Sequence, residues 1–261
     1  MDVQTQIEAF LYPAVTRFLF VGIRVSTVMV FLPFLGSGAL AARIKAALAV
    51  ALSAFMCVIY RPASAELLKV NWVSLALSEA LIGLALGLSV QFVFEAAQVA
   101  GQTCGLQMGH SLESLIDPTT QAQSPAMAIF YYLIATSIFL RLDVHHWLLR
   151  ALAGSFEYLP PGSLVTNRAI IEEMLRASAT MLSVGVQIAA PLILAALMID
   201  LTLGFIGRAS PQLPVMLIGI SVKDLLGVAM IGATLAFWPS QFEGHFERAI
   251  RTGEHMLRLA H

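Results

Sequence analysis

The sequence predicts an all-α, membrane-associated protein built from helical hairpins. Of its 261 residues, 58% are hydrophobic and only 12% are charged, and the mean hydropathy is +0.82. Soluble domains are roughly half apolar and a quarter charged. The apolar runs exceed the usual length of a strand and are rich in alanine and glycine, which favours helices. The net charge of −1 gives no indication of a nucleic acid partner.

Three apolar segments are expected in the first part of the chain. They cover about residues 10–32, 39–60 and 72–99. Pro33 closes the first of them, and Trp72, a residue typical of membrane interfaces, opens the third. A membrane-spanning helix needs about 20 residues. We therefore predict one helix for each segment.

Three more apolar segments are expected in the second part. The predicted elements are residues 126–140 with a continuation at 145–153, a short amphipathic piece at 169–177, and the segments 178–206 and 215–238. The tail, residues 239–261, alternates charged and apolar residues and is predicted to form a surface helix. We find no linker that divides the chain, so residues 1–261 are predicted to form a single helical unit.

Charged residues interrupt these apolar segments. Each would cost roughly 2.5–3.5 kcal/mol at the centre of a bilayer. Pairing of opposite charges, within the chain or between subunits, would offset much of that cost. The alternative is an ordinary six-span protein whose charged side chains reach the membrane edges. The charged residues are Arg17, Arg24, Glu79, Glu95, Asp200, Arg208, Lys223 and Asp224, of which Arg208 lies just after the fifth segment.

A polar, glycine-lined stretch lies between the third and fourth segments, at residues 91–125. A small residue recurs at every fourth position, at Ala97, Gly101, Gly105 and Gly109. On a helix these residues form one stripe with little side-chain bulk, against which another backbone can pack closely. We predict that this stripe packs against another subunit. Such a stretch needs protein or water around it rather than lipid.

Motifs for common catalytic chemistry are not found. The sequence contains no phosphate-binding loop and no HExxH metal motif, and no GxSxG elbow. His145 and His146 are adjacent, so we expect them to point to different sides of a helix and to bind no metal. Asp200 could serve as a proton-relay acid or pair with a basic residue. We predict neither an enzyme nor a cofactor.

Several motifs together resemble the FliR family, the R-type subunit of the flagellar type III export gate, which is homologous to the T-type subunit of injectisomes. Two positions depart from the family pattern: Pro214, where asparagine is usual, and Ser221, where proline is common. The matching motifs are Ala97-x-x-x-Gly101-Gln102-x-x-Gly105-x-Gln107-Met108-Gly109, Asp117-Pro118, Pro160-x-Gly162, Pro191, Gly204-x-x-x-Arg208-x-x-Pro211-Gln212 and Gly219-x-x-x-Lys223-x-x-x-Gly227.

This resemblance implies the architecture, the partners and the location. Residues 1–177 would resemble a P-type subunit and residues 178–238 a Q-type hairpin. The chain would join FliP and FliQ subunits in a closed helical hetero-oligomer that is raised largely out of the bilayer plane. FlhB-type and FlhA-type subunits and unfolded flagellar substrates would be further partners. The location would be the flagellar basal body in the bacterial inner membrane. The distribution of basic residues separately predicts that both termini are cytoplasmic.

The family also places the loop that follows the glycine stripe inside the channel as a plug. In this chain the loop would cover about residues 106–121. Its apolar members could close the pore, because a dewetted apolar constriction holds back ions and water. An ordinary surface loop remains the alternative. The candidate plug residues are Leu106, Met108, His110, Leu112, Leu115, Ile116, Asp117 and Pro118.

A secondary transporter for a small solute or for protons is the alternative function. Glu95, Asp200 and Lys223 would then form a polar site near the middle of the membrane. The two hypotheses differ in one expectation. A transporter should be stable alone, whereas a gate subunit should depend on its P-type partner.

Overall fold

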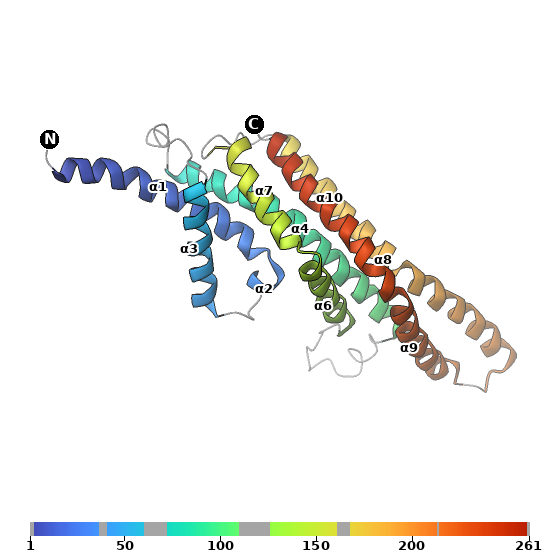
Figure 1. The fold of residues 1–261 in the computed structure, drawn as a ribbon. Coiled ribbons are helices and arrows are strands. Elements are labelled where there is room, and N and C mark those ends of the chain that lie inside the picture. The colour runs from blue at the N-terminus through green and yellow to red at the C-terminus, as the bar shows by residue number, and fades with distance from the viewer. Residues whose placement is uncertain are drawn as a thin grey trace. The chain divides into compact units, whose positions relative to one another are not determined.

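The computed structural model describes residues 3–36, 41–59, 72–109, 126–160, 168–212 and 214–259. Within these ranges every regular element is helical, which confirms the all-α prediction (Figure 1). The elements in chain order are α1 Val3–Val30, α2 Pro33–Gly36, α3 Ala42–Ile59, α4 Trp72–Met108, α6 Ala126–Arg141, α7 Val144–Tyr158, α8 Arg168–Ala209, α9 Val215–Thr234, the 3-10 turn η2 Leu235–Phe237 and α10 Trp238–Leu259.

Four helical stretches in the described part are long and apolar enough to cross a membrane. A fifth is added if α6 and α7 count as one broken span. Length and composition therefore support a multi-pass membrane protein, as predicted. The four stretches are Ala42–Ile59, Trp72–Met108, Ala169–Ala209 and Leu217–Leu259.

Two helices extend beyond the predicted apolar segments. The polar stretch after residue 91 continues α4 without a break, so that α4 has 37 residues. The amphipathic piece at 169–177 is continuous with the fifth apolar segment and forms the first turns of α8, which has 42 residues. Neither junction contains a glycine or proline stop signal. Pro191 lies inside α8.

The interruption predicted after residue 140 is present. Helix α6 ends at Arg141 and α7 begins at Val144. Between them, Asp143 adopts the left-handed conformation with φ 54° and ψ 30°. Few non-glycine residues take this conformation, and aspartate is among those that tolerate it best.

The chain divides into two compact units, which we describe separately. The first, called unit 1, contains Met1–Phe92, Asp143–Ala177 and Phe246–His261. Its core joins side chains of α1, α4, α7 and the end of α10. The C-terminal part of α10 buries apolar residues on one face and exposes Glu247 and Arg251 on the other. The buried members of this core include Phe20, Val25, Ile82, Leu86, Leu152, Phe156, Phe246, Met256 and Leu257.

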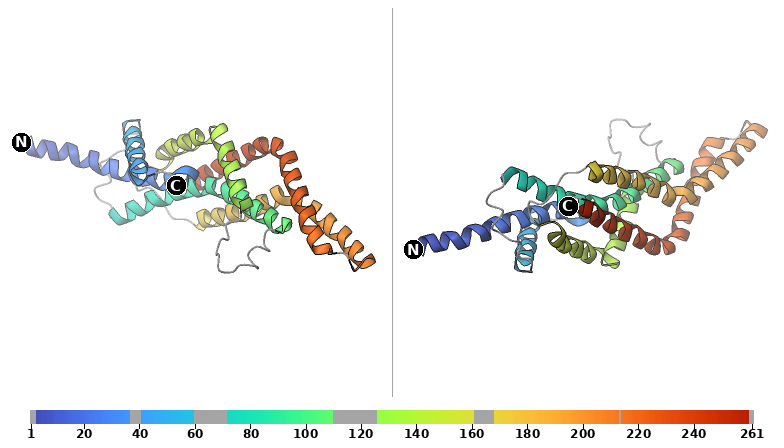
Figure 2. Two further views of the ribbon diagram at one scale, coloured as in Figure 1. Left: turned by 90° about the horizontal axis from the view of Figure 1, so that it is seen from below. Right: turned by 90° about the horizontal axis from the view of Figure 1, so that it is seen from above.

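The second, called unit 2, contains Val93–Leu142 and Ser178–His245. Its core is aromatic: the ring centroids of Phe94 and Phe139 are 5.4 Å apart, and those of Tyr131 and Trp238 are 4.7 Å apart. Within this unit α9 turns back along the last part of α8, so that the two form a hairpin (Figure 2). The positions 210–214 connect them.

Candidate functional site

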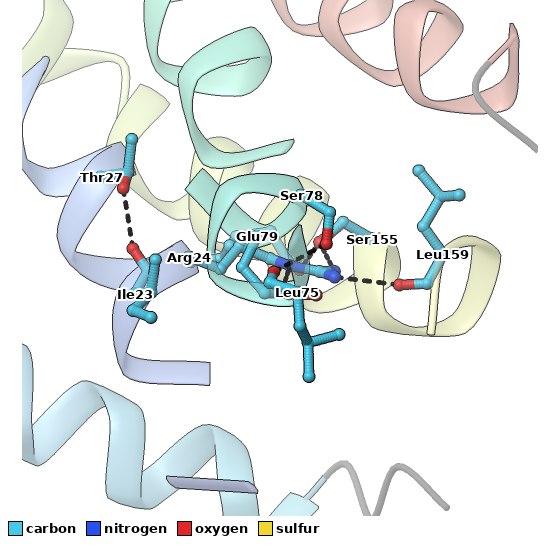
Figure 3. Close-up of polar contacts among 9 residues, drawn as sticks. Ile23, Arg24, Thr27, Leu75, Ser78, Glu79, Ser155 and Leu159 are labelled. Carbon is cyan, nitrogen blue, oxygen red and sulfur yellow. Dashed lines mark hydrogen bonds and ion pairs between the residues drawn. The ribbon is translucent and has the colours of Figure 1, made fainter. Parts of the chain in front are cut away.

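A completely buried ion pair lies in the core of unit 1 (Figure 3). The Nε of Arg24 on α1 donates a hydrogen bond of 2.7 Å to Oε2 of Glu79 on α4, and both side chains are 0% exposed. Arg24 also donates to Ser155 Oγ and to the carbonyl oxygen of Leu159, both at 3.0 Å. Its guanidinium lies 4.2 Å from the ring centroid of Phe156. One side chain therefore connects α1, α4 and the end of α7.

The local sequence explains why this pair can be buried. Gly83 faces α1, because a Cβ there would lie 2.7 Å from the backbone oxygen of Arg24. The two helices therefore approach closely next to the charged residues. Leu159 caps the C-terminus of α7, where a cation is favoured by the helix dipole and can bind the last carbonyl groups. Ser155 Oγ donates to Leu152 O at 2.6 Å and is thus free to accept from Arg24.

A second ion pair lies in unit 2 and differs in its exposure. Lys223 on α9 pairs with Asp200 on α8 across the hairpin. The side chains are 18% and 49% exposed, respectively. The surrounding helix faces carry exposed apolar side chains, including Leu201, Phe205 and Leu225. This pair therefore stands on an apolar surface rather than in a core.

A pocket of about 480 Å³ lies beside this second pair. Leu106, Gln107 and Gly109 at the end of α4 form one wall. The other walls come from α8 and α9, and they include both Asp200 and Lys223. The pocket thus joins the point where α4 ends to the ion pair of the hairpin.

The glycine stripe of α4 packs within the chain. A Cβ at Gly101 would lie 2.5 Å from the backbone oxygen of Met127 on α6, whereas a Cβ at Gly105 would reach only the Met127 side chain, at 3.5 Å. Ala97 is fully buried. We predicted that the stripe packs between subunits; at Gly101 the neighbouring backbone belongs to the chain's own α6.

Gly109 differs from the other members of the stripe, because it lies beyond the helix. Its φ is +93°, and its N–H donates to Leu106 O at 3.2 Å. A glycine in the left-handed conformation is a common helix terminator, since it has no Cβ to clash. The stripe therefore ends with a helix stop, at which a Cβ would also lie 3.3 Å from the Ile220 side chain of α9.

Only two of the candidate plug residues lie in the described part. Leu106 is 63% exposed. Met108 is 1% exposed. It packs against Gly227 of α9, because a Cβ on Gly227 would lie 2.7 Å from the Met108 sulfur. Met108 is therefore a core residue of unit 2, in contrast to its predicted place in the plug. The others, His110, Leu112, Leu115, Ile116, Asp117 and Pro118, lie outside the described residues.

The remaining predicted charges are placed in different surroundings. Arg17, Glu95 and Asp224 are half-buried, and Arg208 is exposed near the end of α8. Sequence reasoning did not identify Ser155 or Leu159 as partners of Arg24. A serine in an apolar helix is common, and Leu159 contributes only its backbone, so neither residue type signals the contact.

The expectation that His145 and His146 point to different sides of the helix was wrong. The ring centroids of His145 and His146 are 4.1 Å apart. Both lie in the first turn of α7, beside the left-handed Asp143. The Oδ1 of Asp143 is 3.8 Å from His145 Nε2 and 3.5 Å from His146 Nδ1. Their long side chains converge because Asp143 precedes the helix and turns its carboxylate across the first turn.

Comparison with known proteins places this architecture in a family. Residues 15–249 match the family described as bacterial export proteins, family 1. The chain belongs to this family. The match covers most of the sequence, including both ion pairs and the glycine stripe. It is consistent with the resemblance stated above, which the FliR relatives confirm.

Named relatives agree with this assignment. The chain is 32% identical over 254 residues to the flagellar biosynthetic protein FliR of Bacillus subtilis (strain 168). The aligned residues cover 95% of this chain and 96% of that relative. It is 34% identical over 161 residues to FliR of Escherichia coli (strain K12), covering 62% of each chain. It is 30% identical over 226 residues to FliR of Pectobacterium carotovorum subsp. carotovorum, covering 86% of each chain.

These findings indicate a component of the flagellar export apparatus. The relatives named here are flagellar biosynthetic proteins, and the family is one of export proteins. Together with the apolar helices, they support membrane-associated export. They give no support to the alternative of a secondary transporter.

Proposed function

We propose that this FliR-family chain is a non-enzymatic subunit of the flagellar type III export gate, and that the loop after α4 closes the export channel. The gate would lie in the inner membrane at the basal body. Its closure is steric: the loop fills the channel at rest and moves when an unfolded substrate enters. Energy would come from other components of the machine.

The fixed end of α4 is the observation that supports this role. Gly101 packs directly against the backbone of α6, and Met108 packs against Gly227 of α9. These contacts hold the last two turns of α4 within unit 2. Gly109 then ends the helix in the left-handed conformation. A segment that blocks a channel needs such an immobile base, since otherwise the passing substrate would displace its attachment.

The chemistry of the loop supports closure. Leu112, Leu115 and Ile116 follow this base within seven residues. Apolar side chains that converge in a narrow pore expel water, and the dewetted constriction holds back ions. Leu106 extends the apolar surface backward onto α4, where it is 63% exposed. The plug would therefore combine steric obstruction with an apolar seal.

The partners that we propose follow from the exposed hairpin and the family. The apolar face of α8 and α9 would contact FliQ, and the first part of the chain would contact FliP. FlhB-type and FlhA-type subunits would complete the export apparatus. Burial of the exposed apolar side chains against these subunits would be favourable by about 25 cal/mol per Å² of apolar surface removed from water.

Deletion of residues 112–116 tests the plug. In cells that express the complete gate, the deletion should raise ion leakage across the membrane, because it removes the apolar seal. Replacing the same five residues with serine and glycine should also raise the leak, although the loop keeps its length. The matched control deletes five residues, 63–67, in the connection before α4. An unchanged leak from both plug variants, in gates that still assemble, would contradict the proposal.

A further inference from the structure

A cluster of three metal-ligating side chains lies at the start of α7 and plays no part in the proposed gating. Asp143, His145 and His146 each offer one ligand atom, and these atoms all lie within 4.8 Å of one another. No other group of this kind was found among the described residues. All three belong to unit 1 and come from one short stretch of sequence.

The backbone at Asp143 favours this convergence. Aspartate is among the best N-cap residues because its carboxylate usually accepts from the first free N–H groups of the helix. Asp143 is the N-cap of α7, yet its side chain makes no such hydrogen bond. Its φ of 54° instead turns the carboxylate toward the two imidazoles. The Asp143 carboxylate thus lies near the imidazoles of His145 and His146 and does not cap the helix.

We propose that Asp143, His145 and His146 bind a divalent transition-metal ion, with Zn²⁺ as the best fit. Tetrahedral zinc with ligand bonds near 2.0–2.1 Å separates its ligand atoms by about 3.3 Å. The observed separations from Asp143 Oδ1, 3.5 and 3.8 Å, differ from that value by amounts that small side-chain rotations remove. The two imidazole ligand atoms lie within 4.8 Å of each other, and rotation of their side chains would bring them to the same separation.

The ligand types select the class of metal. Two imidazoles and one carboxylate suit zinc and its first-row neighbours, whereas Mg²⁺ and Ca²⁺ prefer oxygen ligands. Three protein ligands leave the fourth tetrahedral position to water. The side chains of Asp143 and His146 are 65% and 60% exposed, so the site is open to solvent. The ion would therefore exchange with the surroundings and would hold the first turn of α7 to its cap.

Metal binding by the full-length chain, purified in complex with its gate subunits, tests this proposal. The chain is prepared with an affinity tag that contains no histidine and is freed of metal with a chelator. Titration with Zn²⁺ should give one bound equivalent per chain. Co²⁺ should give the visible absorption of a tetrahedral site, and Zn²⁺ should displace that absorption.

Variants identify the ligands. His146→Gln and Asp143→Asn should each abolish the one-equivalent Zn²⁺ binding and the Co²⁺ band; both side chains are exposed, so the fold is retained. His255→Gln, which alters an exposed histidine on α10, is the matched control and should bind as the unmodified chain does. Equal binding by all four proteins, or binding of Zn²⁺ only at millimolar concentration, would overturn the proposal.

Discussion

Two ion pairs that connect helices, Arg24–Glu79 and Asp200–Lys223, stand in opposite surroundings. In unit 1, Arg24 and Glu79 are 0% exposed, and Arg24 bonds to three groups from two other helices. In unit 2, Asp200 is 49% exposed, and its partner Lys223 lies on the same apolar hairpin surface. A charge pair in a core is satisfied by the chain itself. A charge pair on an apolar face is only half enclosed.

This difference points to a surface that is available for assembly. In unit 1, the Arg24–Glu79 pair is enclosed and connects α1, α4 and α7 through one guanidinium, although α3 of this unit also exposes apolar side chains such as Phe55 and Val58. Unit 2 presents two apolar stripes, one on each helix of its hairpin, and a half-exposed ion pair lies among them. We therefore infer that the hairpin of unit 2 is a surface for assembly. The exposed members are Leu194, Leu197, Met198, Leu201 and Phe205 on α8, and Ile218, Val222, Leu225 and Val228 on α9.

Removing one partner of the buried pair should have the largest effect. Arg24→Met leaves the Glu79 carboxylate buried without its cation, which should cost about 3–5 kcal/mol of stability. The measurement is thermal unfolding of the purified chain in detergent, followed on the helical circular dichroism signal. Arg24→Met combined with Glu79→Met removes both charges and should recover much of the loss. A single variant as stable as the unmodified chain would contradict the role of this pair.

Disrupting the backbone packing of α4 should have the second-largest effect on stability. Two glycines of unit 2 give a matched pair of variants. Gly101→Ala would place a Cβ 2.5 Å from the Met127 backbone oxygen, and such overpacking should cost about 1–3 kcal/mol. Gly105→Ala meets only ordinary contacts at 3.5 Å. It should be neutral or stabilising by about 0.5–1 kcal/mol, because glycine in a helix interior is less favourable than alanine. The same unfolding measurement distinguishes them, and equal effects would argue against close α4–α6 packing.

The exposed pair should matter little to the isolated chain. Partly exposed ion pairs contribute about 0.2–1 kcal/mol, so Asp200→Asn should lower the unfolding temperature only slightly. In the proposed gate the hairpin is covered, and the same variant should then reduce the amount of chain that co-purifies with FliP and FliQ. Comparison of the two measurements for one variant sharpens the contrast between the units. A large loss in the isolated chain would mean that this pair, too, is structural.

The smallest effect is expected on the exposed face of α10. Glu247 and Arg251 form an i, i+4 pair at 2.6 Å, with side chains 53% and 74% exposed. Such helical pairs contribute about 0.3–0.5 kcal/mol, so Glu247→Gln should change stability by no more than that in unfolding experiments. It should also leave co-purification with the gate subunits unaltered. A loss of co-purification would show that the assembly surface extends to α10.

Much of the fold follows from local sequence patterns. Long apolar runs give helices because a buried or membrane-embedded backbone must satisfy its own hydrogen bonds. The break before Val144 was also predictable, since Arg141 and Asp143 interrupt the apolar pattern. The full lengths of α4 and α8 were not predicted. In both helices the change between polar and apolar residues was taken as the end of a segment, although no stop signal marks it.

The sites depend on contacts that sequence spacing does not encode. Arg24 and Glu79 are 55 residues apart, and Arg24 and Ser155 are 131 apart. The presence of charged residues in apolar segments indicated buried charges, but it did not indicate which of them pair. For His145 and His146, helical spacing alone suggested divergent side chains. The left-handed Asp143 and the long imidazole side chains instead brought the three groups together.

Site-specific photo-cross-linking at position 225 tests directly whether another gate subunit covers the hairpin. Leu225 is 75% exposed on the apolar face of α9, and a photoreactive residue there samples whatever covers the hairpin in native membranes. We expect adducts with another export-gate subunit. The same residue at position 148, where Leu148 is 2% exposed in unit 1, should give no adduct with another protein. Adducts with lipid alone at position 225, in cells that assemble working flagella, would contradict the assignment of this surface to assembly.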